Sequence, residues 1–126
     1  MIPRFRAFDS GSLCRMYSPE EVWVCDDNIW VVDEDSWNGE LILNNDLNLM
    51  QSTGLFDKNG KEIFEGDIIV SRDVLLTGVI EFRADLGMLV SALVEYNNFE
   101  RLCDVANSSE IIGNIWEHPE LAEVKQ

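Results

Sequence analysis

The apolar residues of this chain occur in short runs, mostly of four or five, and Asn, Asp, Gly or Ser interrupts each run. Such spacing is typical of β-strands joined by turns, because a helix needs an apolar stripe that recurs every three or four residues over ten or more positions. The segments that fit a strand are 4–8, 13–17, 22–24, 29–32, 40–43, 48–51, 61–64, 67–71, 78–83, 89–93 and 110–115. The pattern therefore predicts a mainly β protein.

One reversal of the chain is specified by its own residue types. Asp57, Lys58, Asn59 and Gly60 stand between two predicted strands. Asn and Gly tolerate the positive φ of a tight turn, and Asp can accept hydrogen bonds from the turn backbone. Gly66 then interrupts an apolar run, where a bulge or sharp bend redirects a strand. We interpret Asp57, Asn59, Gly60 and Gly66 as structural turn residues, and the bend predicts a partly barrel-like, SH3-like C-terminal half.

Helical signal is concentrated at the C-terminus. Pro119 suits the first position of a helix, and the glutamate after it places a negative charge in the first turn, where it opposes the helix dipole favourably. We expect one short helix within residues 117–124. The stretch 96–109 has no clear period, so it is expected to form either a helical turn or a long loop.

Length and composition predict one folded domain spanning residues 1–126. Apolar residues make up 46% of the chain and include four Trp, six Phe and two Tyr, which is enough to offset the entropy lost on folding. A division near Leu55 would be an architectural seam within that domain.

The charge balance disfavours several classes of partner. The chain contains nine basic and 24 acidic residues, which gives a net charge of −15. Direct binding of DNA or RNA is disfavoured because it depends on Lys and Arg, and anionic membranes are disfavoured for the same reason. No run is long enough for a membrane span or a signal peptide, so we expect a cytoplasmic protein.

The number and spacing of the cysteines indicate neither a disulfide framework nor a zinc site. Cys14, Cys25 and Cys103 are odd in number and lack C-x-x-C spacing, which fits a reducing compartment. We expect them to be small strand or core residues.

Three segments carry a family resemblance: residues 50–69 (MQSTGLFDKNGKEIFEGDII), residues 4–9 (RFRAFD) and residues 110–121 (EIIGNIWEHPEL). In this order they resemble the signature of the YopX-like family of phage and prophage proteins. The resemblance implies a mostly β fold with a bent, mixed sheet and an origin in temperate phages or integrated elements of bacteria. The family is one of uncharacterised function, so the resemblance implies no catalytic residue. By residue type, Thr53-Gly54-Leu55 supplies turn chemistry.

An acidic loop is the best place to look for a metal ion. Asp33 and Asp35, with Asn38 nearby, supply the oxygen ligands that Ca²⁺ prefers. An EF-hand would need Asp or Asn at the fifth position and Gly at the sixth, where this chain has Trp37 and Asn38. A solvated acidic loop is the better interpretation, and we assign no metal site and no cofactor.

The single histidine offers little for catalysis. His118 lies near a predicted helix start, and no nucleophile elbow of the form G-x-S-x-G is present. We interpret His118 as an exposed or capping residue and assign no catalytic residue.

The tryptophans divide by their surroundings. Trp23 and Trp30 lie in strand-like runs, which favours burial or one sheet face. Trp37 stands among polar turn residues, so with Asp33 and Asp35 it is a candidate protein-binding residue. The alternative, which we favour because large aromatics usually find cover, is that Trp37 folds back onto the sheet.

Two classes of function remain open. The leading hypothesis is a non-enzymatic protein–protein interaction module that uses a strand edge or an aromatic loop to bind a host or phage protein. A sharper version is an acidic nucleic-acid mimic that inhibits a host DNA- or RNA-binding protein. The second class is a metal-dependent hydrolase that uses Asp33 and Asp35. A homo-oligomer built through strand edges is a third alternative.

Overall fold

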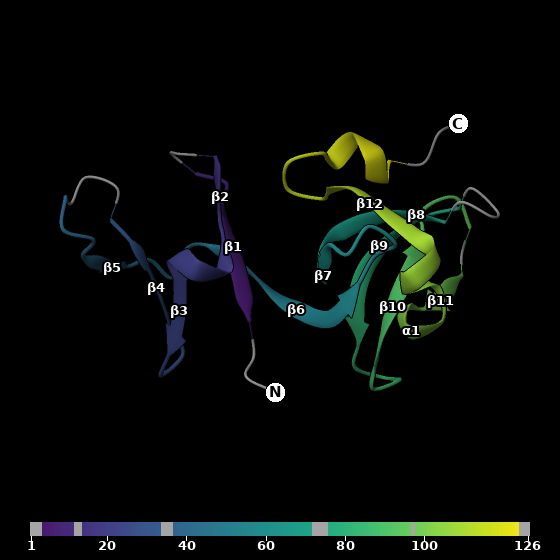
Figure 1. Ribbon diagram of the computed structural model, residues 1–126, viewed down its shortest axis with the longest axis horizontal. Coiled ribbons are helices and arrows are strands. Elements are labelled where there is room, and N and C mark those ends of the chain that lie inside the picture. Colours follow the sequence, from purple (N-terminus) through teal and green to yellow (C-terminus); the bar gives the residue numbers. More distant parts are fainter. Residues whose placement is uncertain (1–3, 12–13, 34–36, 72–75, 97, 124–126) are drawn as a thin grey trace. The chain divides into compact units, whose positions relative to one another are not determined.

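Residues 4–11, 14–33, 37–71, 76–96 and 98–123 are described by the computed structural model drawn in Figure 1. The chain divides into two compact units, Met1–Gln51 and Ser52–Gln126, called here the N-terminal and C-terminal units. The boundary falls within strand β6 (Asn48–Phe56). The first residues of β6 pair with β1 in the N-terminal unit, and its last residues pair with β7 in the C-terminal unit.

The N-terminal unit is built from antiparallel strands. Strand β1 pairs with β2 on one side and with the start of β6 on the other. Strands β3, β4 and β5 form a separate sheet in which each pairs with the next. The bounds are β1 (Phe5–Asp9), β2 (Arg15–Tyr17), the 3₁₀ turn η1 (Pro19–Glu21), β3 (Val22–Cys25), β4 (Asn28–Val32) and β5 (Leu41–Leu43).

A small core joins these two groups of strands. Its buried members come from β1, β2, β3, β4 and the residue before β6: Ala7, Tyr17, Val22, Ile29, Val31 and Leu47. Because side chains alternate along a strand, β4 buries Ile29 and Val31 and directs Trp30 to its other side. One side of the β3–β4–β5 sheet is therefore committed to the core.

The C-terminal unit contains a five-stranded antiparallel sheet in the order β11-β10-β9-β8-β12, curled into a half barrel (Figure 1). A short α-helix and a 3₁₀ turn connect β11 to β12, and a second 3₁₀ turn follows β12. The bounds are β7 (Glu62–Phe64), β8 (Asp67–Ser71), β9 (Leu76–Arg83), β10 (Met88–Leu93), β11 (Phe99–Arg101), α1 (Leu102–Val105), η2 (Ala106–Ser108), β12 (Ser109–Asn114) and η3 (Pro119–Ala122).

Strand β8 of this sheet is buried on both sides. Ile68 and Ile69 are neighbours on β8 and point to opposite faces, yet their exposed fractions are 0% and 2%. The core on one face comprises Ile63, Ile69, Ile80, Leu102 and Ala106. Unlike the β3–β4–β5 sheet, the half barrel has cover on each face of strand β8.

Asp57 fixes the turn between β6 and β7 and ties it to β12. Its Oδ1 accepts hydrogen bonds from the backbone N–H groups of Asn59 and Lys61, both at 2.9 Å, and its Oδ2 accepts one from Ile111 at 3.1 Å. Burial alone would raise the pKa of Asp57, but these three N–H donors outweigh it and lower the pKa. Gly60 has the positive φ, 80°, that this turn demands.

The mainly β class predicted from the sequence is confirmed, with a curled, partly barrel-like sheet in the C-terminal unit. The sheet is not mixed, however, because every pairing among the described residues is antiparallel. The expected C-terminal helix is the short 3₁₀ turn η3, since only Pro119–Ala122 complete a turn before the backbone becomes extended at Glu123.

Two local predictions need correction. Thr53-Gly54-Leu55 forms an irregular part of β6 rather than a turn: Gly54 has a φ of 76°, and the Thr53 hydroxyl donates to the carbonyl of Ile63 at 2.7 Å. The stretch 96–109 contains strand β11 as well as helical turns.

Gly66, expected at a bend, lies between β7 and β8 with a φ of 87°, and its N–H donates to the carbonyl of Ile80 at 2.8 Å.

Candidate functional site

The side of the β3–β4–β5 sheet that faces away from the core carries large apolar side chains. Residues directly opposite each other on antiparallel strands point to the same face. Trp23 pairs with Trp30, and Trp30 pairs with Leu43, so these three form a row across all three strands. Alternation adds Cys25, Val32 and Leu41 to this face. We call the set Trp23, Cys25, Trp30, Val32, Leu41 and Leu43 the outer face.

The outer face is accessible. The exposed fractions of its side chains are 45% for Trp23, 44% for Leu41 and 51% for Leu43, while Trp30 and Val32 are half-buried. Contiguous apolar surface of this kind is uncommon on a folded protein outside sites of interaction. The sequence placed Trp23 and Trp30 in strands, but which residues shared a face depended on the register set by the turn at Asp26 and Asp27.

Acidic side chains lie at the ends of this sheet. Asp26 and Asp27 form the β3–β4 turn, with φ values of 51° and 65°. Asp46 follows β5 at the same end, next to Asn45, whose side chain bonds to Asn28 and to the N–H of Ile29. In the sequence, no Lys, Arg or His occurs between Arg15 and Lys58. The end of the sheet that holds the β3–β4 turn therefore carries the acidic residues Asp26, Asp27 and Asp46.

At the other end of the sheet lies the predicted acidic loop. The N–H of Asp33 donates to the carbonyl of Glu40 at 2.7 Å, which closes the base of the loop between β4 and β5. Trp37 in this loop is 96% exposed, so the interpretation that it folds back onto the sheet is wrong: no neighbouring described side chain covers it. Asp35 lies outside the described residues, and its part in partner binding stays a prediction.

The described part of the chain brings no three His, Cys, Asp or Glu side chains close enough together to hold a metal ion. Within the same residues, no helix has the length and apolar character that crossing a membrane requires. Cys14, Cys25 and Cys103 are all exposed free thiols, so none of them is a core residue. Cys25 lies in strand β3, as expected for a small strand residue, whereas Cys14 precedes β2 and Cys103 lies in α1.

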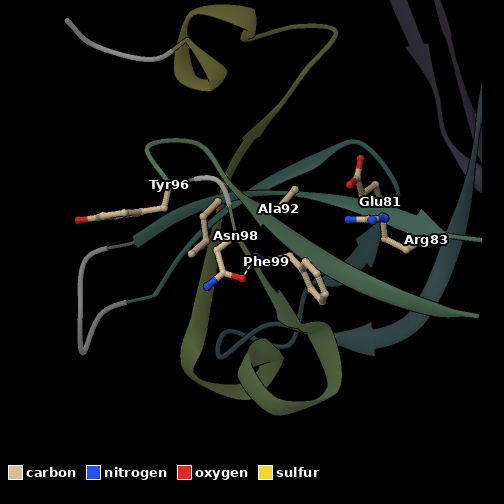
Figure 2. Close-up of a pocket in the computed structure, with 7 residues that line it drawn as sticks. Glu81, Arg83, Ala92, Tyr96, Asn98 and Phe99 are labelled. Atoms are coloured by element: carbon tan, nitrogen blue, oxygen red, sulfur yellow. Dashed lines mark hydrogen bonds between the residues drawn. The ribbon is translucent and has the colours of Figure 1, made fainter. Parts of the chain in front are cut away.

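A second candidate site is an open hollow of about 410 Å³ on the C-terminal unit, shown in Figure 2. It is lined by Glu81, Arg83, Ala92, Leu93, Tyr96, Asn98 and Phe99. Arg83 already donates two hydrogen bonds to Asp85, each at 3.1 Å, and its guanidinium lies 5.2 Å from the centre of the Phe99 ring. Through these hydrogen bonds, Asp85 raises the pKa of Arg83 and Arg83 lowers the pKa of Asp85. Each charge is therefore already paired with the other.

This hollow escaped sequence reasoning because strand β11, which supplies Phe99, was not predicted. Its aromatic side chains offer stacking surface, and Figure 2 shows Glu81 and Arg83 side by side. The outer face presents more apolar surface with less internal pairing, so it is the stronger candidate.

His118 has a structural part in the described residues. Its Nδ1 accepts a hydrogen bond from the N–H of Asn114 at 3.3 Å. Asn114 is buried, and its side chain accepts from the N–H groups of Trp116 and Glu117. Together these bonds close the turn after β12 and position η3.

Comparison with known proteins gives a consistent result. Residues 4–123 match the family model described as YopX protein. The chain is similar to the crystal structure of protein EF1440 from Enterococcus faecalis, with 27% sequence identity and a TM-score of 0.66 over 98% of this chain and 99% of that one. It is also similar to the crystal structure of protein yopX from Bacillus subtilis, with 19% identity and a TM-score of 0.58 over 94% and 96%. Among curated protein sequences there is no match.

Proposed function

The chain belongs to the YopX protein family, and from that premise we propose that it is a non-enzymatic protein–protein interaction module that binds its partner through the outer face. We place it among phage or prophage accessory proteins that act in the bacterial cytoplasm. The observation that carries the proposal is the row of Trp23, Trp30 and Leu43 across three strands.

The outer face suits binding for two physical reasons. Burial of apolar surface contributes about 25 cal/mol per Å², and Trp is among the residues that most often dominate the affinity of protein interfaces. The same strands are also held from behind by Val22, Ile29 and Val31 in the core. A surface fixed in this way loses little conformational entropy when a partner binds.

A second candidate function is favoured by one observation. Residues 16–57 contain ten acidic residues and no Lys, Arg or His. Such a charge distribution along the sequence is compatible with an acidic mimic that occupies the basic groove of a nucleic-acid-binding protein. Mimicry predicts binding that salt abolishes and that the loss of Trp23 leaves intact, whereas the outer-face proposal predicts the reverse dependence on Trp23.

The test is affinity capture from nuclease-treated bacterial extract with three forms of the protein. Leu43→Ser removes an apolar side chain from the outer face, and Leu86→Ser is the matched control, since Leu86 is 44% exposed in the β9–β10 turn of the C-terminal unit. We expect a partner that is retained at moderate salt by the unmodified protein and the control but lost from Leu43→Ser. Equal retention by all three forms contradicts the proposal.

A further inference from the structure

The outer face and its acidic border together indicate the chemistry of the partner. We propose that the outer face docks a basic amphipathic segment of another protein, whose apolar side chains cover Trp23, Trp30 and Leu43 and whose Lys or Arg residues meet the acidic end of the sheet. This inference rests on the proposed function, because it specifies the partner of the same surface.

The acidic end is defined by Asp26, Asp27 and Asp46. All three side chains are exposed, and none of them forms an ion pair within the described part of the chain. By contrast, Glu20 and Glu21, before β3, pair with Arg4 and Arg15. The uncompensated charge therefore lies at the end of the sheet that holds the β3–β4 turn. A partner that places positive charge there gains electrostatic complementarity as well as apolar burial.

Charge argues against a second copy of this chain as the occupant. Each copy carries a net charge of −15, and apposition of two outer faces would bring their acidic borders together. Like charges brought together at an interface repel each other and suppress that pairing. A basic partner relieves the same repulsion, so the charge pattern selects a heterologous segment rather than self-association.

The first test uses a random-peptide display library against the immobilised full chain. We expect selected peptides to be enriched in Lys and Arg together with large apolar residues. One selected peptide, made synthetically, should bind Trp23→Ser at least about tenfold more weakly, the loss typical of a truncated hot spot. Leu86→Ser should bind it with unchanged affinity.

The charge component has a conservative test. Asn tolerates the positive φ of Asp26 and Asp27 at least as well as Asp does, so the double variant Asp26→Asn/Asp27→Asn removes two charges without a change of backbone. We expect this variant to bind the selected peptide several-fold more weakly than the unmodified protein does at low salt. The difference in affinity should shrink as added salt screens the charges. Asp85→Asn, in the C-terminal unit, is the matched control and should have no effect.

Cys25 reports directly on occupancy because its thiol lies on the outer face. In a variant that keeps Cys25 and replaces Cys14 and Cys103 by Ser, we expect the selected peptide to slow alkylation of the thiol. A matched variant that keeps only Cys103, an exposed residue of α1, should be alkylated at the same rate with and without peptide.

The outcomes separate the two proposals. Peptides that need Trp23 but are neutral or acidic would overturn the basic partner while the interaction module stands. Both proposals would be overturned if the selected peptides bound the Trp23→Ser variant with unchanged affinity. They would also be overturned if no peptide were enriched over blank beads. Protection of Cys25 without peptide, together with a doubled mass in sedimentation, would show that a second copy occupies the face and would overturn the heterologous partner.

Discussion

The β3–β4–β5 sheet of the N-terminal unit buries Val31 on one side and shows a row of tryptophan and leucine on the other, whereas β8 of the C-terminal unit buries both Ile68 and Ile69. Strand β8 is covered on both faces, and the C-terminal unit fixes its turns with buried polar groups such as Asp57. The N-terminal unit leaves one sheet face uncovered. The difference separates residues that maintain the fold from residues available for contact.

The largest expected effect is the loss of the Asp57 carboxylate. In Asp57→Asn, an amide N–H group can face the N–H of Ile111, which now donates to a carboxylate oxygen, so at least one partly buried donor loses its acceptor. We expect the free energy of unfolding to fall by about 3 kcal/mol, the loss typical of a broken charge-assisted hydrogen-bond network. Urea denaturation followed by circular dichroism measures it.

The control for this change is Asp85→Asn, which removes an exposed carboxylate paired with Arg83. Exposed ion pairs contribute little to stability, because water screens their charges, so this loss should be much smaller than that of Asp57→Asn. If the two substitutions destabilised the protein equally, Asp57 would not be the anchor of the β6–β7 turn, and the assignment of buried polar groups to the fold of the C-terminal unit would fail.

A smaller effect is expected at the end of β12. A Cβ added at Gly113 would lie 2.7 Å from Nδ1, 2.9 Å from Cγ and 3.1 Å from Cβ of His118, so Gly113→Ala must displace that side chain. We expect a loss of about 2 kcal/mol, as for other overpacked sites. His118→Ala removes the obstacle, so in a double-mutant cycle the two losses should be less than additive. Additive losses would mean that the cost of Gly113→Ala does not arise from a clash with the His118 ring.

The pH dependence of stability tests the role of the Asp57 carboxylate in the C-terminal unit in a second way. The pKa of Asp57 in the folded chain is lower than the ordinary value of 3.8, so its contribution is fully present above pH 3.8 and is lost as the pH falls through the folded-state pKa. We expect acid titration of the unfolding free energy to show a steeper decline below pH 3.8 in the unmodified protein than in Asp57→Asn. Parallel curves would show that this carboxylate is not selectively stabilised by folding.

The sequence predicted those features of the fold that depend on residues close together in the chain. The turn at Asp57 and Gly60 could be read because the residues that form it are adjacent, but the bond from Asp57 to Ile111 joins positions 54 apart and leaves no local pattern. Likewise, the alignment of Trp23 with Trp30 depends on a two-residue turn, and a shift of one position would place them on opposite faces. Exposure of Trp37 could not be predicted either, since it depends on how the loop closes at its base.

The smallest change in stability is expected on the outer face, and it tests whether that face is free. Val31→Ala, on the buried side of the sheet, should cost about 2 kcal/mol, because it leaves a cavity in the core. Leu43→Ser, on the opposite side, should change the free energy of unfolding by less than about 0.5 kcal/mol, as surface substitutions do. Equal losses in urea denaturation would mean that Leu43 is covered in the folded chain. A negligible loss together with a lost partner in affinity capture would instead show that Leu43 serves contact with another protein, because its apolar surface then contributes free energy only when the partner is bound.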